Sequence, residues 1–207
     1  MIVRIFLWGA LMTLPVFFVQ IGFTYLLDWT NINSVIKGLA YWFLIIAFSE
    51  EFFKFLVIRL KVINSPHLDE PLDVMLYMVV AALGFAAVEN ILYLFPPMGP
   101  MPFDQLVWKT AFILVIRFVG ATFLHTLCSA VIGYSLAISF CEVKMKRTTI
   151  AAGIIMAVLL HGIYDFSIMT LDGYAKFAIP IIVIITLAFL VFSGFEKLKK
   201  MKSICKI

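Results

Sequence analysis

Six long apolar runs dominate this sequence and restrict its fold more than any other feature. They cover about residues 5–27, 35–60, 72–95, 103–141, 148–171 and 174–195, and each exceeds the roughly 20 residues that a helix needs to cross a membrane. Of the 207 residues, 64% are hydrophobic, against about half in soluble domains. The sequence therefore predicts an all-α polytopic membrane protein. We expect a bundle of about six transmembrane helices that forms a single membrane-embedded domain, residues 1–207.

The segments between the runs carry turn signals. Residues 28–34 are polar and contain Asn33, which favours a helix start. The segment from Pro96 to Pro102 is too rich in proline to be helical. Asp172-Gly173 predicts a tight turn before the last helix. The first run shows no cleavage site after a short apolar region, so we interpret it as a retained transmembrane helix and not as a signal peptide.

The distribution of basic residues predicts the orientation. Eleven of the 16 lysines and arginines lie in the N-terminus, the second and fourth connections and the C-terminal tail. The opposite connections hold three, namely Lys37, Lys109 and Lys176. Because cytoplasmic segments carry an excess of positive charge, both termini are predicted to be cytoplasmic in a bacterial cell membrane.

Eight ionisable residues remain at membrane depth, where a charge costs at least about 2–3 kcal/mol unless it is paired or faces water. They belong to four consecutive predicted helices, so we expect these helices to turn one polar stripe each toward a shared interior. This predicts a functional core over about residues 35–170. The eight residues are Glu50, Glu51, Lys54, Glu89, Arg117, His125, His161 and Asp165.

The residue types favour hydrolysis by an activated water molecule. Two neighbouring carboxylates out of water cannot both ionise cheaply, so one of Glu50 and Glu51 can act as a base while the other stays protonated or paired. The spacing of i and i+4 makes Glu50 the expected ion-pair partner of Lys54. The sequence does not decide which of the two glutamates is the base.

The histidines have two roles open to them. They can orient the water or a developing oxyanion, or they can bind a metal. Glu89, His125 and His161 would suit Zn²⁺ or another divalent metal with one open position. Asp165, one turn after His161, could accept its ring N–H and fix the tautomer.

Each of these residues also has a structural explanation. Glu89 could be satisfied by a hydrogen bond to Asn90, and Arg117 is expected to be a structural partner of a carboxylate. His125 could make only an interhelical hydrogen bond. Three cysteines, Cys128, Cys141 and Cys205, form no metal or disulfide pattern, and we interpret them as inert.

Four motifs in order resemble the PrsW family of bacterial intramembrane proteases, itself similar to the type II CAAX prenyl endopeptidases. They are Glu50-Glu51-x-x-Lys54, Phe85-x-x-x-Glu89, His125 on the next helix, and His161-x-x-x-Asp165. The resemblance implies catalytic roles for Glu50, Glu51, His125 and His161. It also implies a single-pass membrane protein as substrate, with site-1 cleavage of a membrane-anchored anti-sigma factor.

A transporter is the alternative from another functional class. Intramembrane carboxylates and histidines also form proton relays, so a small proton- or cation-coupled transporter would use the same residue types. Transporters usually contain internal repeats and broken helices, and the sequence shows no internal repeat. The residues therefore favour the peptidase.

Overall fold

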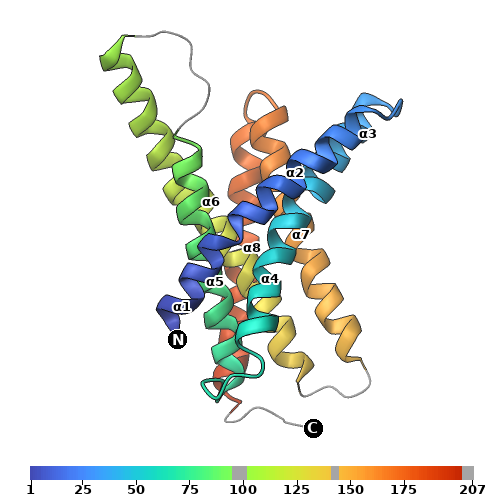
Figure 1. Cartoon of the computed structure of the whole chain (residues 1–207), viewed down its shortest axis with the longest axis vertical. Helices are drawn as coiled ribbons and strands as arrows, with labels where there is room; N and C mark the ends of the chain where they lie inside the picture. Colours follow the sequence, from blue (N-terminus) through green and yellow to red (C-terminus); the bar gives the residue numbers. More distant parts are fainter. Residues whose placement is uncertain (95–101, 141–144, 202–207) are drawn as a thin grey trace.

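The computed structural model describes residues 1–94, 102–140 and 145–201, and within these ranges it contains helices and no strands (Figure 1). Residues 96–101 of the predicted proline-rich segment, Cys141, Cys205 and the basic residue Lys144 lie outside the described residues. The elements are α1 (Ile2–Leu11), α2 (Thr13–Asp28), α3 (Ser34–Leu39), the π-helix η1 (Ala40–Phe48), α4 (Ser49–Lys61), α5 (Pro71–Leu92), α6 (Phe103–Ser139), α7 (Lys146–Thr170) and α8 (Ala175–Lys199).

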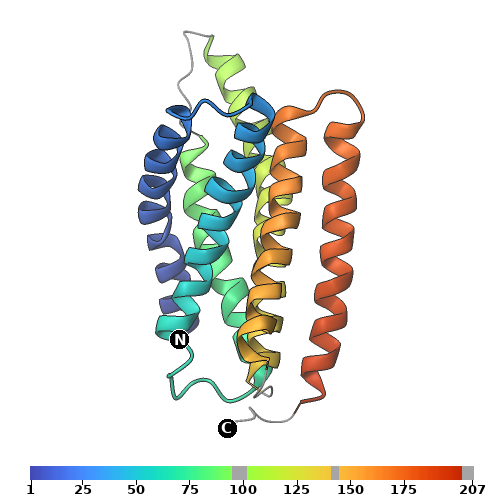
Figure 2. The same ribbon diagram turned by 90° about the vertical axis from the view of Figure 1, so that its right-hand side faces the viewer.

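Five helical segments of the described chain are long and apolar enough to cross a membrane, which confirms an all-α multi-pass protein. They are α1 and α2 taken together, α5, α6, α7 and α8. The predicted helix over residues 35–60 is present as α3, η1 and α4, which follow one another without a gap. Figure 2 shows that the axes of the long helices are roughly aligned with one another.

Local sequence explains two of the helix boundaries. Helix α5 begins at Pro71, whose missing N–H costs nothing in the first turn, and Glu70 and Asp73 form a reciprocal capping box around it. The first predicted helix is interrupted at Met12, between α1 and α2. Pro15 lies three residues later and cannot donate a backbone hydrogen bond to the preceding turn, which accounts for the break.

The π-helix η1 was not predicted. Its nine residues end immediately before Ser49 and Glu50. The Ser49 hydroxyl donates to the backbone oxygen of Ile45 at 2.5 Å and also lies 3.1 Å from that of Ile46. Segments of π-helix are rare and are frequently found at functional sites. Because apolar residues suit α- and π-helical turns equally, hydrophobic periodicity could not distinguish them.

Two glycines set the distance between α1 and α5, which cross where α1 and α2 run diagonally over the front of the bundle (Figure 1). A Cβ atom on Gly9 would lie 2.0 Å from the backbone oxygen of Ala81, and one on Gly84 would lie 2.0 Å from that of Phe6. Small residues allow such close backbone approach between membrane helices. This contact holds the N-terminal helix against the centre of the bundle.

We expect Gly84→Ala to destabilise the protein by about 1–3 kcal/mol, because the added methyl group forces α1 away from α5. Gly22→Ala on α2 is the matched control, since no atom of another part of the structure lies within 4 Å of the added Cβ. Thermal unfolding in detergent micelles would measure both variants. Equal melting temperatures would contradict the proposed close contact.

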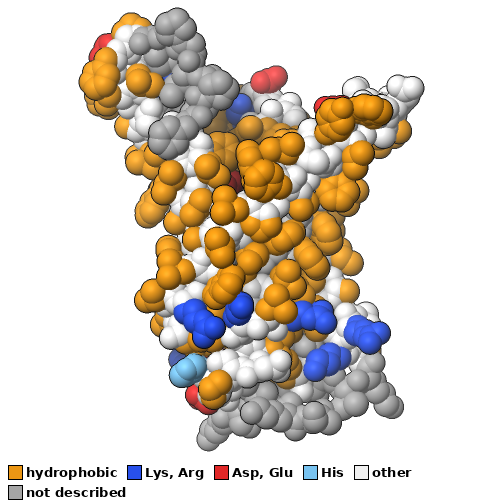
Figure 3. All heavy atoms as spheres, in the orientation of Figure 1, with side chains coloured by type: hydrophobic (Ala, Val, Ile, Leu, Met, Phe, Trp, Pro, Cys, Tyr) orange, Lys and Arg blue, Asp and Glu red, His pale blue; other side chains and the backbone are white. Residues whose placement is uncertain are grey.

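Charged side chains are distributed unevenly along the bundle. In Figure 3 lysine and arginine side chains form a band near the end of the molecule where α1 begins, and hydrophobic side chains cover the surface beyond it. Helix α8 ends at the same end of the bundle (Figure 2). On the face shown in Figure 3, an apolar surface is thus bordered at one end by positive charge.

Candidate active site

The predicted polar residues come together inside the bundle. Glu50, Glu51 and Lys54 come from α4, Glu89 from α5, His125 from α6, and His161 and Asp165 from α7. The side chains of Glu51 and Lys54 are completely buried, and the two imidazole rings lie 5.0 Å apart, edge to face. Each helix therefore turns its polar stripe inward, as burial of charge in a membrane protein requires.

Glu51 has a partner at each carboxylate oxygen. Its Oε1 accepts from Lys54 Nζ at 2.7 Å and lies 3.0 Å from His161 Nδ1. Its Oε2 accepts from Ser129 Oγ at 3.2 Å. The carboxylate is thus held on three sides by groups from α4, α6 and α7.

Lys54 lies within ion-pair distance of Glu50, but the prediction that Glu50 is its better partner was wrong, because Glu51 lies closer. The Lys54 ammonium lies 4.0 Å from Glu50 and 2.7 Å from Glu51. Both i+3 and i+4 neighbours are within reach on a helix. His125 Nδ1 lies 2.7 Å from Lys54 Nζ, and together with Glu51 it fixes the position of the ammonium.

Glu50 is the less satisfied of the two glutamates. Its Oε1 accepts from Gln20 Nε2 of α2 at 3.2 Å. Its Oε2 is the only buried side-chain nitrogen or oxygen in the described residues that has no hydrogen-bond partner. This oxygen lies 3.8 Å from His125 Nδ1 and 3.8 Å from His161 Nε2. A buried polar atom without a partner is costly, which suggests a functional role.

His125 is held at both ring nitrogens. Lys54 can only donate, so Nδ1 accepts, and Nε2 therefore donates to Glu89 Oε2 at 2.6 Å. Glu89 in turn pairs with Arg117 at 3.1 Å, as expected for a structural arginine. The expected Glu89–Asn90 bond is replaced by other contacts, because Asn90 accepts from Arg117 at 3.3 Å and donates to Thr122 at 2.9 Å.

His161 lies between two carboxylates. Its Nδ1 faces Glu51, and its Nε2 lies 3.1 Å from Asp165 Oδ2 on the next turn of α7. This contact is the one that the i,i+4 spacing predicts. With a carboxylate at each nitrogen, the ring cannot rotate without losing a contact, so its orientation toward Glu50 is fixed.

The geometry groups different metal ligands from those predicted. Glu50, His125 and His161 each offer one atom within 4.8 Å of the others, and Glu50 takes the place expected for Glu89. Glu89 already contacts Arg117 and the outer nitrogen of His125. Ligands of a tetrahedral zinc lie roughly 3.3 Å apart for bonds of about 2.0–2.1 Å. The separations of 3.8 Å and the unpartnered Glu50 oxygen therefore fit a divalent metal, which would have to displace Lys54 from His125 Nδ1 and Asp165 from His161 Nε2.

Glu51, Cys128 and His161 form a second candidate group. Cys128 is fully buried, one helical turn after His125. We interpreted this cysteine as inert, and only its i+3 spacing from His125 could have indicated otherwise. Because both Glu51 oxygens already have partners, the group that contains Glu50 is the better candidate.

A small cavity of about 90 Å³ reaches this cluster. Glu89, His125, His161 and Asp165 contribute to its wall, together with Arg117 and Tyr93. One water molecule requires on the order of 10–15 Å³ of such space, so several fit. Glu50 does not line this cavity, but its Oε2 lies 3.8 Å from two residues that do, His125 and His161.

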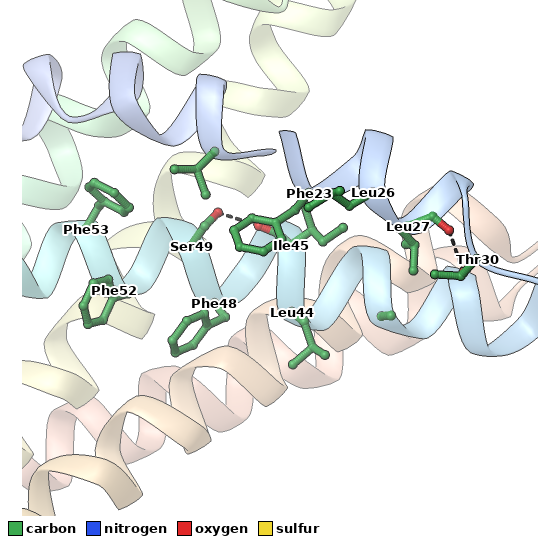
Figure 4. Close-up of a pocket in the computed structure, with 12 residues that line it drawn as sticks. Phe23, Leu26, Leu27, Thr30, Leu44, Ile45, Phe48, Ser49, Phe52 and Phe53 are labelled. Atoms are coloured by element: carbon green, nitrogen blue, oxygen red, sulfur yellow. Dashed lines mark hydrogen bonds between the residues drawn. The ribbon is translucent and has the colours of Figure 1, made fainter. Parts of the chain in front are cut away.

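A larger apolar groove of about 660 Å³ lies between α2 and the continuous segment formed by η1 and α4. In Figure 4, Phe23 and Leu26 of α2 lie beside Ile45 of η1, whereas Leu44 and Phe48 project from the other side of η1. Ile45 and Ser49 are buried, whereas Leu44 and Phe48 are exposed. Ser49, the residue before Glu50, belongs to the lining of the groove, as do Phe52 and Phe53 of α4.

Sequence reasoning missed the polar groups that surround the motifs. Gln20 donates a hydrogen bond to Glu50, and Ser129 donates one to Glu51. Ser49 precedes Glu50 and accepts from Gln20. A single uncharged polar residue in an apolar helix is a weak signal, because it can also bond to its own backbone.

Fold and site together define a polytopic membrane enzyme whose buried carboxylates and histidines are arranged for hydrolysis. The family described as "PrsW family intramembrane metalloprotease" matches residues 1–193, and the chain belongs to this family. It is thus an intramembrane protease. No solved structure matches the chain.

Several curated proteins named Protease PrsW are similar to the chain. The protein of Bacillus subtilis is 29% identical over 205 residues, which cover 99% of this chain and 84% of that protein. The protein of Shouchella clausii is 31% identical over 188 residues, with coverage of 90% and 79%. The protein of Geobacillus kaustophilus is 31% identical over 176 residues, with coverage of 85% and 70%. These relatives favour a protease over the transporter alternative.

Proposed function

We propose that this protease hydrolyses a peptide bond of a single-pass membrane protein with water activated at Glu50, His125 and His161. The observation that carries the proposal is the buried Glu50 Oε2, which has no partner among the described residues and faces both histidines at 3.8 Å. Both oxygens of Glu51 have partners, so among the oxygens of these two buried glutamates Glu50 Oε2 is the one left available to bind a metal or a proton.

Glu50, His125 and His161 would hold a divalent metal. Such a metal would polarise the scissile carbonyl and make water a nucleophile at neutral pH. Glu51 orients His161 through Nδ1, and Glu89 orients His125 through Nε2. Carboxylates at the outer nitrogens of ligand histidines are the usual means of fixing such rings.

Proton transfer requires a carboxylate that water can reach. Hydrolysis adds oxygen to the carbonyl carbon and a proton to the leaving amine, so a nearby group must accept a proton and return it. Asp165 and Glu89 both line the cavity. Glu89 is already engaged by Arg117 and by His125. We therefore assign the proton transfer to Asp165, 3.1 Å from His161 Nε2.

The apolar groove supports a transmembrane segment as substrate. Its lining contains no charged side chain and includes Ser49, the residue before Glu50. An apolar helix that lies in the groove would bring its backbone to the catalytic cluster without crossing the bundle. By the resemblance of the motifs, the substrate is an anti-sigma factor cut at site 1.

The basic band supports the predicted orientation. Lysine and arginine side chains gather near the end where α1 begins. Because cytoplasmic segments of membrane proteins carry an excess of positive charge, this band favours an orientation with both termini in the cytoplasm of a bacterial cell.

Metal removal tests the proposed chemistry. Purified protein in liposomes should cleave a single-pass substrate with a short outer domain, and a strong chelator should reduce cleavage by at least about a hundredfold. Added Zn²⁺ should restore it. Cleavage that survives complete metal removal would contradict the metal and leave Glu50 as the proton acceptor itself. A folded wild type that cleaves no single-pass substrate would overturn the proposed substrate class.

A further inference from the structure

Gln20 is the polar residue that links α2 to the catalytic cluster, although none of the four motifs lies on this helix. Its Nε2 lies 3.2 Å from Glu50 Oε1 and 3.3 Å from Ser49 Oγ. The residues around it, from Pro15 to Phe23, are otherwise apolar apart from Gly22. An amide in this position is costly unless it is hydrogen-bonded, and both of its contacts lie on α4, 29 and 30 residues away in the sequence.

The contact decides which oxygen of Glu50 remains available. Lys54 Nζ lies 4.0 Å from Glu50 Oε2, so a small rotation of the carboxylate would form a charge-assisted hydrogen bond to the ammonium. Such a bond would occupy the oxygen that faces His125 and His161. Gln20 holds Oε1 on the opposite side, toward α2, and thereby opposes this rotation.

Ser49 fixes the amide in turn. The single hydroxyl hydrogen of Ser49 is directed to the backbone oxygen of Ile45 in η1. The lone pairs of Ser49 Oγ are then free to accept from Gln20 Nε2. A chain of hydrogen bonds thus runs from Ile45 in η1 through Ser49 and Gln20 to Glu50. It links the position of the Glu50 carboxylate to the backbone of the π-helix.

We propose that Gln20 is a positioning residue of this protease, which holds Glu50 Oε1 so that Oε2 stays directed at His125 and His161. The proposal rests on the role assigned to Glu50 under the proposed function. It makes α2, a helix outside the four motifs, part of the support of the active site.

Gln20→Met tests this role, because methionine has nearly the same length and no hydrogen-bond donor. The matched control is Thr24→Val, one turn further along α2, whose hydroxyl donates only to the backbone of its own helix. The mole fraction of the substrate in the liposome membrane is varied to obtain kcat and the half-saturating fraction. We expect Gln20→Met to lower kcat about 10–100-fold. The half-saturating substrate fraction should change less than threefold. Thr24→Val should keep both within twofold.

A spectroscopic measurement separates positioning from general damage. The infrared difference between each protein and its Glu50→Gln counterpart isolates the carboxyl band of Glu50. This band should shift in Gln20→Met and stay in place in Thr24→Val, because only the first substitution removes a hydrogen bond to Glu50. If Gln20→Met does not fold, Gln20→Asn serves instead, since the shorter side chain withdraws the amide from Glu50.

An unchanged kcat, an unmoved Glu50 band, or a change confined to half-saturation would each overturn the positioning role. The proposed function fails separately. If Glu50→Gln still cleaves, the assignment of Glu50 is wrong. If Glu50→Gln is inactive and Gln20→Met is fully active, only the inference about Gln20 is wrong.

Discussion

Glu50→Gln is expected to reduce cleavage by about a thousandfold or more, the size of loss seen when a central catalytic group is removed. Glutamine keeps the shape of the side chain but binds neither a proton nor a metal with comparable strength. The hydrogen bond from Gln20 reaches Oε1 and can be kept if the new amide places its oxygen there. The substitution therefore changes the chemistry of the site far more than its geometry.

Stability should not fall with activity in this variant. Glu50 Oε2 has no partner in the described residues, so replacing the carboxylate by a neutral amide removes a buried acceptor without breaking a hydrogen bond. We expect an unchanged or higher melting temperature in detergent. Glu196→Gln on α8 is the control, since Glu196 lies outside the cluster, and it should cleave like the wild type. Cleavage by Glu50→Gln within tenfold of the wild type would refute a central role for this residue.

Lys54→Met is expected to lower the free energy of unfolding by about 3–5 kcal/mol, because it leaves the buried Glu51 without its cation. Lys54 and Glu51 are both completely buried and lie 2.7 Å apart. The substitution also removes the donor to His125 Nδ1. We expect a marked loss of stability in denaturant titrations of the detergent-solubilised protein, and loss of activity with it.

A double variant identifies the cause. In Lys54→Met/Glu51→Gln no buried charge remains unpaired at this pair, so part of the lost stability should return. The exposed Lys199→Met on α8 controls for loss of a positive charge and should have little effect. If the loss in free energy of unfolding of the double variant equals the sum of the losses in Lys54→Met and Glu51→Gln, the two side chains do not interact and the observed pairing is wrong.

Much of the architecture is local information that the chain carries in its hydropathy and its turn residues. A helix of about 20 apolar residues must satisfy its backbone internally in a membrane, so long apolar runs can only be helices here. Pro71 with its capping residues and the Asp172-Gly173 turn mark boundaries for equally local reasons. The convergence of α4 to α7 on one polar interior follows from the cost of charge in hydrocarbon, and the structure brings these residues together as predicted.

Tertiary structure alone decided how the convergent residues are paired. Lys54 could reach either glutamate by spacing, and contacts from α6 and α7 select Glu51. Glu50 replaces Glu89 in the candidate metal group because α5 turns Glu89 toward Arg117. Gln20 and Cys128 join the cluster through helices whose own patterns showed no function. Sequence spacing determines which residues share one helix face, but the rotation and depth of each helix against its neighbours determine which atoms meet.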